Sequence, residues 1–115
     1  MKIATDILQS KLVEILPIES ADMFWLVTSK PKLHVRDDEP LSNYDRWEHY
    51  PAWSLSALMS VLPEGIIENY YAPNLQKENG KYSIAYGNDE LLCIADNPVD
   101  VCYEMIIKLH EMDLI

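Results

Sequence analysis

The clearest structural signal in the sequence is the stretch NPVDVCYEMIIKLHEM, residues 97–112. Asn97 can cap a helix with its side chain, Pro98 suits the first helical position, and Asp100 lies near the positive end of the helix dipole. Apolar side chains follow at the three- and four-residue spacing of one helix face. The stretch therefore predicts a helix to about residue 112. Its expected core stripe is Val99, Cys102, Ile106 and Leu109.

Three strand candidates precede this helix, at residues 67–73, 82–86 and 91–95. They are rich in aromatic and aliphatic residues. Glu78-Asn79-Gly80 and Gly87-Asn88-Asp89 separate them as turn signals. The simplest arrangement of these segments is a three-stranded antiparallel meander.

The N-terminal half alternates helix and strand signals in a looser way. Residues 6–16 place apolar side chains on one helical stripe, which Thr5 or Asp6 can cap and Pro17 ends. Residues 23–28 and 33–36 predict a β-hairpin, with His34 on the face opposite Leu33 and Val35.

Residues 37–50 show no periodicity and predict an irregular loop. Pro51 then opens a predicted helix that Pro63 stops, with Leu55, Leu58, Met59 and Leu62 as its buried positions. Trp25 and Trp53 are expected in the core.

The order helix, hairpin, helix, meander, helix predicts an α+β fold in a single domain, residues 1–115. We expect one antiparallel sheet of about five strands with about three helices packed mainly on one face. Apolar residues make up 49% of the chain and charged residues 24%, which is the composition of a folded globular protein.

A formal net charge of −10 excludes several classes of partner. Such a chain repels phosphate backbones and anionic membrane surfaces, so we expect no direct nucleic-acid or membrane binding. No apolar run approaches the roughly 18 residues of a membrane span. The N-terminus meets Asp6 before any apolar signal region forms, which favours a cytoplasmic location.

Three segments carry a resemblance to other proteins: Ile18-Glu19-Ser20-Ala21-Asp22-Met23, Pro51-Ala52-Trp53-Ser54-Leu55-Ser56-Ala57-Leu58, and residues 99–111. Together they resemble a group of small bacterial proteins of unknown activity that are encoded in prophages and other mobile elements. The resemblance covers the chain in outline. It implies an accessory protein of a mobile element and supplies no enzymatic activity.

Histidine and cysteine are the residues that most often carry acid–base, metal or nucleophilic chemistry. His110 lies near the end of the last predicted helix, where the helix dipole favours a cationic ring, and His34 is expected to be exposed on its strand. Cys93 and Cys102 lack a CxxC spacing or a companion histidine pair. We therefore interpret both as buried free thiols and expect no metal or other cofactor.

The loop at residues 37–50 is the strongest candidate for function. His49 lies near Asp45 and Glu48, and residues 37–39 are all acidic, so the loop can form a cation site or an acid–base pair. No spacing forces these groups to converge. The aromatic residues Tyr44, Trp47 and Tyr50 can instead anchor a partner.

These observations favour a non-enzymatic interaction module whose partner, a basic protein, docks on Tyr44, Trp47, His49 and Tyr50. One alternative is an acidic nucleic-acid mimic that occupies the basic groove of another protein. A second is a small hydrolase that uses His49 with nearby carboxylates, or Cys93 with a histidine. A homodimer is compatible with each of these functions.

Overall fold

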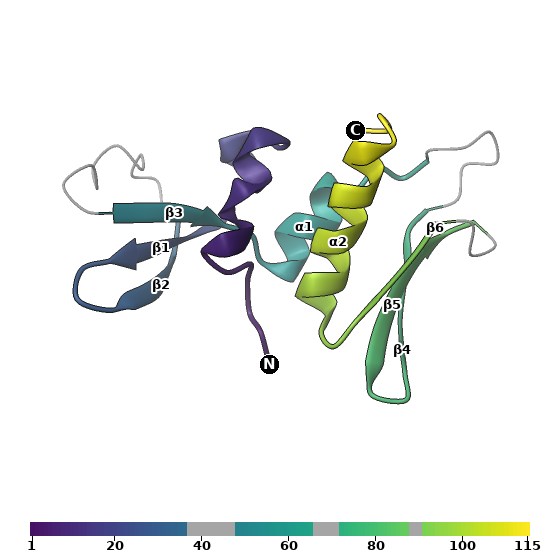
Figure 1. Ribbon diagram of the computed structural model, residues 1–115, viewed down its shortest axis with the longest axis horizontal. Coiled ribbons are helices and arrows are strands. Elements are labelled where there is room, and N and C mark those ends of the chain that lie inside the picture. The colour runs from purple at the N-terminus through teal and green to yellow at the C-terminus, as the bar shows by residue number, and fades with distance from the viewer. Residues whose placement is uncertain (37–47, 66–71, 88–90) are drawn as a thin grey trace.

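The computed structural model describes residues 1–36, 48–65, 72–87 and 91–115. The described elements form an α+β fold, as the sequence predicts (Figure 1). In chain order they are the 3-10 helices η1 (Leu8–Glu14) and η2 (Ile18–Ser20), strands β1 (Met23–Val27), β2 (Pro31–Val35) and β3 (Glu48–Ala52), helix α1 (Leu55–Val61), strands β4 (Asn74–Glu78), β5 (Lys81–Tyr86) and β6 (Leu91–Ala95), and helix α2 (Pro98–Glu111).

The six described strands form two antiparallel sheets of three strands each. The first sheet has the order β2-β1-β3 and the second has the order β4-β5-β6. Figure 1 shows them at opposite ends of the molecule, with α1 and α2 between them. The single five-stranded sheet expected from the sequence is therefore wrong, because the helices separate the hairpin from the meander.

The second sheet is the predicted meander. Asn79 and Gly80 have φ angles of 53° and 77°, as a tight two-residue hairpin turn requires. The strands predicted at 82–86 and 91–95 are present. Most of the strand candidate at 67–73 lies outside the described residues, and the strand before the turn, β4, runs from Asn74 to Glu78. Polar residues dominate β4 because it is a largely exposed edge strand.

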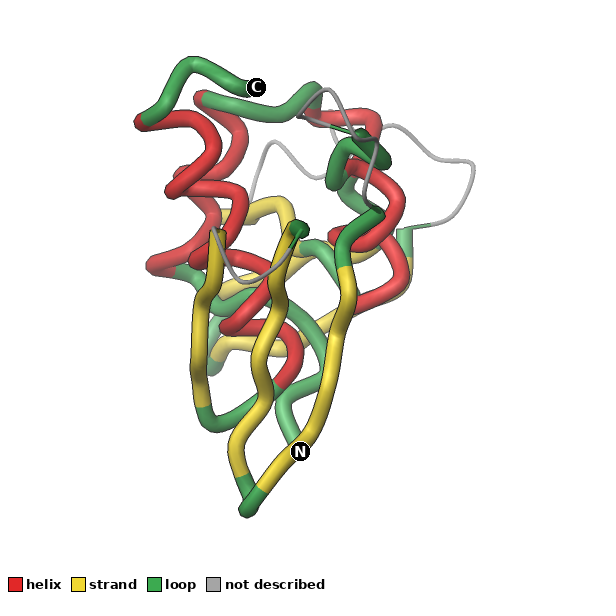
Figure 2. The backbone as a smooth tube through the Cα atoms, turned by 90° about the vertical axis from the view of Figure 1, so that its right-hand side faces the viewer, coloured by secondary structure: helices red, strands yellow, loops and turns green. Residues whose placement is uncertain are grey.

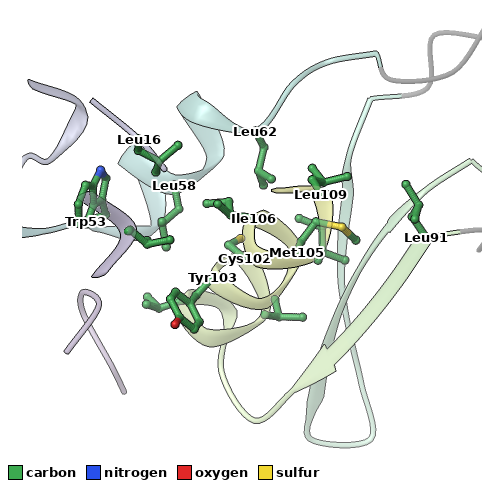
Figure 3. Close-up of a cluster of buried hydrophobic side chains, with 14 of the residues drawn as sticks. Leu16, Trp53, Leu58, Leu62, Leu91, Cys102, Tyr103, Met105, Ile106 and Leu109 are labelled. Carbon is green, nitrogen blue, oxygen red and sulfur yellow. The ribbon is translucent and has the colours of Figure 1, made fainter. Parts of the chain in front are cut away.

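Helix α2 is the centre of the core, and its start is as predicted. The Asn97 side chain accepts a hydrogen bond from the Asp100 backbone N–H at 2.8 Å. The helix packs on β5, β6 and α1. Figure 3 shows side chains of α2 meeting Leu58 and Leu62 on one side and Leu91 on the other. The predicted core residues Val99, Cys102, Ile106 and Leu109 are all buried.

The prediction that Pro51 opens a helix is wrong. Pro51 lies in β3, an edge strand of the first sheet, where a missing backbone N–H is tolerated. Helix α1 begins after Ser54, whose hydroxyl accepts from the Ala57 N–H at 3.2 Å. Trp53 is fully buried, as expected, and its indole N–H donates to the Ser20 hydroxyl.

The segment predicted as a helix at 6–16 forms the 3-10 helix η1 instead. Its Asp6 carboxylate accepts from the Gln9 N–H at 2.9 Å, so Asp6 provides the expected cap. A 3-10 helix has about three residues per turn, so residues four apart no longer share a face. Leu12 is consequently buried whereas Leu8 is 86% exposed.

Candidate partner-binding surface

The first sheet presents an aromatic row on one of its faces. Trp25 on β1 lies opposite Leu33 on β2 and opposite Tyr50 on β3. Directly opposed residues of an antiparallel sheet project to the same face, so the three side chains form one line across the sheet. All three are partly exposed. We call these three residues, the aromatic Trp25 and Tyr50 and the aliphatic Leu33 beside them, the aromatic row.

Trp25 is fixed in position although it is not a core residue. Its indole N–H donates to the Thr5 carbonyl oxygen at 2.8 Å. Thr5 is itself buried and bonded to Trp53 through its backbone N–H and its hydroxyl. The expectation that Trp25 lies in the core is therefore wrong, because the residue is only partly buried and is not among the core residues.

A shallow hollow of about 310 Å³ lies beside the indole of Trp25. It is lined by Asp6, Ile7, Leu8, Trp25 and Pro31. Four of these five side chains are apolar, and Leu8 and Pro31 are exposed. We call this hollow the Trp25 groove. It can accept an apolar side chain from another molecule.

Acidic groups flank this surface. The Tyr50 hydroxyl donates to the exposed Glu48 carboxylate at 2.6 Å, and this hydrogen bond raises the pKa of Tyr50 above its ordinary value. On the groove side, the Asp6 carboxylate is 3.1 Å from the Lys2 ammonium. Glu48 is therefore an exposed anion beside the aromatic row.

The opposite face of the first sheet carries His49. It lies opposite Leu26, and on the same face His34 stacks on Phe24 with ring centroids 5.3 Å apart and planes 15° apart. His34 is half-buried, so the expectation of an exposed strand residue is wrong. His49 and Tyr50 are adjacent in β3 and therefore project to opposite faces. They do not share one patch.

The remaining predicted site residues are placed as follows. Tyr44 and Trp47 lie outside the described residues. Residues 48–50, predicted as the end of an irregular loop, are the first part of β3. His110 is exposed in the last turn of α2, as expected, and its Nδ1 lies 3.3 Å from the Ile115 carbonyl oxygen.

The two cysteines are free thiols. Cys102 is fully buried, its Sγ lies 3.6 Å from the Met59 sulfur, and burial raises its pKa to about 11. Cys93 is only half-buried, so the expectation of a buried thiol is wrong at this position, and burial still raises its pKa. A raised pKa disfavours the nucleophilic thiolate. Across the described ranges, no three His, Cys, Asp or Glu side chains are grouped so that they could hold a metal ion.

A polar cluster fastens the N-terminal segment to α2. The Asp100 carboxylate accepts from Lys2 at 2.7 Å, from the Gln9 amide at 2.9 Å and from the Asn97 amide at 2.8 Å. Partial burial acts to raise the pKa of Asp100, but these hydrogen bonds and the Lys2 charge outweigh it and lower the pKa. The cluster holds the residues that line the Trp25 groove against the rest of the fold.

Sequence reasoning identified Tyr50 but missed Trp25, Leu33 and Leu8 as surface residues. No signal in the sequence indicated strand β3. Trp25 and Tyr50 can be recognised as neighbours only when residues 48–52 are recognised as a strand. Comparison with protein-family models, curated proteins and solved structures finds no match. Within the described residues, each helix is too short or too polar to cross a lipid bilayer.

Proposed function

We propose that this chain is a non-enzymatic interaction module that binds a protein segment on the aromatic row and in the Trp25 groove. The observation that carries the proposal is Trp25, a partly exposed residue whose indole is anchored by the Thr5 carbonyl oxygen and bordered by an apolar groove. Trp and Tyr are the residues that most often dominate binding energy at protein interfaces. A ring that is already fixed loses little conformational entropy when a partner binds.

The partner is a segment with an apolar anchor and a basic side chain. The groove is lined mainly by apolar groups and accepts the anchor. Glu48 beside Tyr50 is placed to pair with Lys or Arg, and the net charge of −10 attracts a basic partner from a distance. As an accessory of a mobile element, the protein would meet such a segment on a host protein.

Fewer observations support the two alternative functions. The acidic mimic stays a prediction that rests on the net charge of −10. The hydrolase also stays a prediction, centred on His49.

The experiment is a selection from random peptides of about 12 residues displayed on phage, with the whole chain as bait. We expect the enriched peptides to share a large apolar residue near Lys or Arg. Trp25→Ala is expected to reduce their affinity at least about tenfold and Glu48→Gln by a smaller factor. Circular dichroism shows whether each variant stays folded.

The matched control is Tyr82→Ala, which removes a partly exposed aromatic side chain from the second sheet. It should leave peptide binding unchanged. Peptides that bind folded Trp25→Ala as well as they bind the unaltered chain would contradict the proposal.

A further inference from the structure

The outer edge of the second sheet is formed by β6, and its hydrogen-bonding groups can be assigned residue by residue. The two-residue turn makes Glu78 and Lys81 a hydrogen-bonded pair, and such pairs alternate along an antiparallel ladder. In β5, Tyr82, Ile84 and Tyr86 therefore bond to β6, so Leu91, Cys93 and Ala95 point their backbone groups at β5. The N–H and C=O groups of Leu92 and Ile94 point away from the sheet.

In the part of the chain that the structure describes, a hollow lies on each face of the sheet beside this edge. Leu92 and Ile94 are 37% and 61% exposed, and both line a hollow of about 490 Å³ on the outer face of the sheet. A second hollow of about 530 Å³ follows β6 on the helix side, where Cys93 and Ile94 meet Asp100 and Glu104. Figure 2 shows the second sheet nearest the viewer, with α2 behind it.

Strand β6 lacks the features that normally protect a sheet edge. Edge strands commonly carry Lys, other charges or proline, which prevent pairing with another chain. Strand β4, at the other edge of this sheet, has Lys77 and Glu78, and β2 has Pro31 and Lys32. Strand β6 reads Leu-Leu-Cys-Ile-Ala and contains no such residue.

Two α2 side chains of opposite charge, Glu104 and Lys108, lie beside this edge. Lys108 Nζ lies 3.4 Å from the Leu92 carbonyl oxygen, at one end of β6. Glu104, one helical turn earlier, lines the hollow beside Ile94 at the other end. A two-fold rotation about Cys93 exchanges the two ends of the strand. The rotation therefore brings Glu104 of each copy toward Lys108 of the other copy, which gives two equivalent pairs of opposite charge.

We propose that β6 pairs antiparallel with β6 of a second copy of this chain, about a two-fold axis at Cys93, to form a continuous six-stranded sheet. Leu92 then lies opposite Ile94 of the partner subunit, and these pairs exchange hydrogen bonds through their outward-facing backbone groups. The Leu92 carbonyl oxygen, which accepts from Lys108, has a second lone pair for this bond. Their aliphatic side chains cover one another on the outer face. The two Cys93 residues form the central non-hydrogen-bonded pair, whose Cα atoms are about 4.5 Å apart in such ladders.

Sedimentation equilibrium from about 1 to 200 μM is the primary test, since a short edge pairing gives a small interface of moderate affinity. We expect a dimer of twice the 13.3 kDa chain mass. Ile94→Lys places a charge at the exposed edge and should raise the dimer dissociation constant at least about tenfold. The matched control is Gln76→Lys, which lies on the same face and in the same row of the sheet but on β4, and should leave it unchanged.

A charge exchange tests the orientation of the two copies. Glu104→Lys alone brings like charges together and should weaken the dimer, whereas Glu104→Lys combined with Lys108→Glu should restore it. A double variant that dimerises no better than Glu104→Lys would overturn the antiparallel arrangement. A monomer over the whole concentration range would overturn the proposal itself.

Cysteine cross-linking tests the register. Diamide removes two electrons and two protons from a pair of thiols, which become a disulfide while diamide becomes a hydrazine. The Cα separation expected for the two Cys93 residues is within the range of disulfides. We expect a cross-linked dimer with Cys102→Ser but not with Cys93→Ser. A dimer that Cys93 fails to cross-link would overturn the pairing of β6 with β6. Peptide selection on Trp25 is independent of each of these outcomes.

Discussion

The two sheets of this protein have the same number of strands and nearly opposite physical roles. The second sheet places one face on α2, where Ile84 and Tyr86 are fully buried. The first sheet contacts η1 instead and leaves the aromatic row half-exposed. From this difference in burial we expect the second sheet and α2 to carry most of the stability, and the first sheet carries the surface proposed for a partner.

The contrast also follows from how each tryptophan is held. Trp53 is fully buried, and its indole N–H bonds to Ser20. Trp25 bonds in a similar way to Thr5 but remains half-exposed. A fixed ring that is not covered contributes little to the core and much to a binding surface.

The largest expected effect comes from a core truncation in α2. Ile106→Ala removes methyl groups from a fully buried position and should lower the free energy of unfolding by about 3 kcal/mol. Leu33→Ala, in the half-exposed aromatic row, should lower it by less than about 1 kcal/mol. Urea denaturation followed by tryptophan fluorescence measures both. Equal losses would remove the distinction between the sheets.

The hydroxyl groups of two tyrosines, one in each sheet, allow a finer comparison of the two sheets. Tyr86 is buried and donates to the Pro63 carbonyl oxygen at 2.7 Å, and burial raises its pKa well above its ordinary value. Tyr86→Phe should destabilise the protein by about 1.5 kcal/mol because that carbonyl loses its partner. Tyr50→Phe removes only an exposed hydrogen bond and should leave the unfolding midpoint unchanged. A larger effect at Tyr50 would contradict its assignment to the surface.

The smallest expected effect concerns the cluster that joins the two halves. Asp100→Asn should lower the free energy of unfolding at pH 7 by about 1 kcal/mol, a modest value because the carboxylate is partly exposed. The lowered pKa of Asp100 means that the unfolded chain binds this proton first as pH falls. Its contribution is therefore complete above the ordinary value near 3.8 and lost as pH falls further.

The pH dependence of stability distinguishes a contribution from the Asp100 charge from a contribution of packing. Between pH 5 and pH 2.5, about the range over which Asp titrates, the unaltered chain should lose more stability than Asp100→Asn. Thermal unfolding at a series of pH values measures the difference. Parallel curves for the two proteins would show that Asp100 contributes nothing through its charge.

The fold was predictable where local signals and burial agree. Asn97, Pro98 and the apolar stripe fixed α2, and Asn79-Gly80 fixed the turn between β4 and β5. Strand β3 was not predictable, since Glu48–Ala52 lacks alternation, includes Pro51 and is stabilised by long-range contacts, namely its pairing with β1 and its packing on η1. The same pairing creates the aromatic row. The candidate surface was therefore not predictable from the sequence, because strand β3, which completes it, was not predictable.

Amide hydrogen exchange of the whole chain, measured with and without the tightest selected peptide, tests the division between the sheets most directly. The free protein should show its strongest protection in α2 and β5, which open only with the core. Adding the peptide should slow exchange in Met23–Val27 and Leu8–Glu14 and leave α2 and the second sheet unchanged. Protection gained in β4, β5 or β6 instead would contradict the assignment of binding to the first sheet.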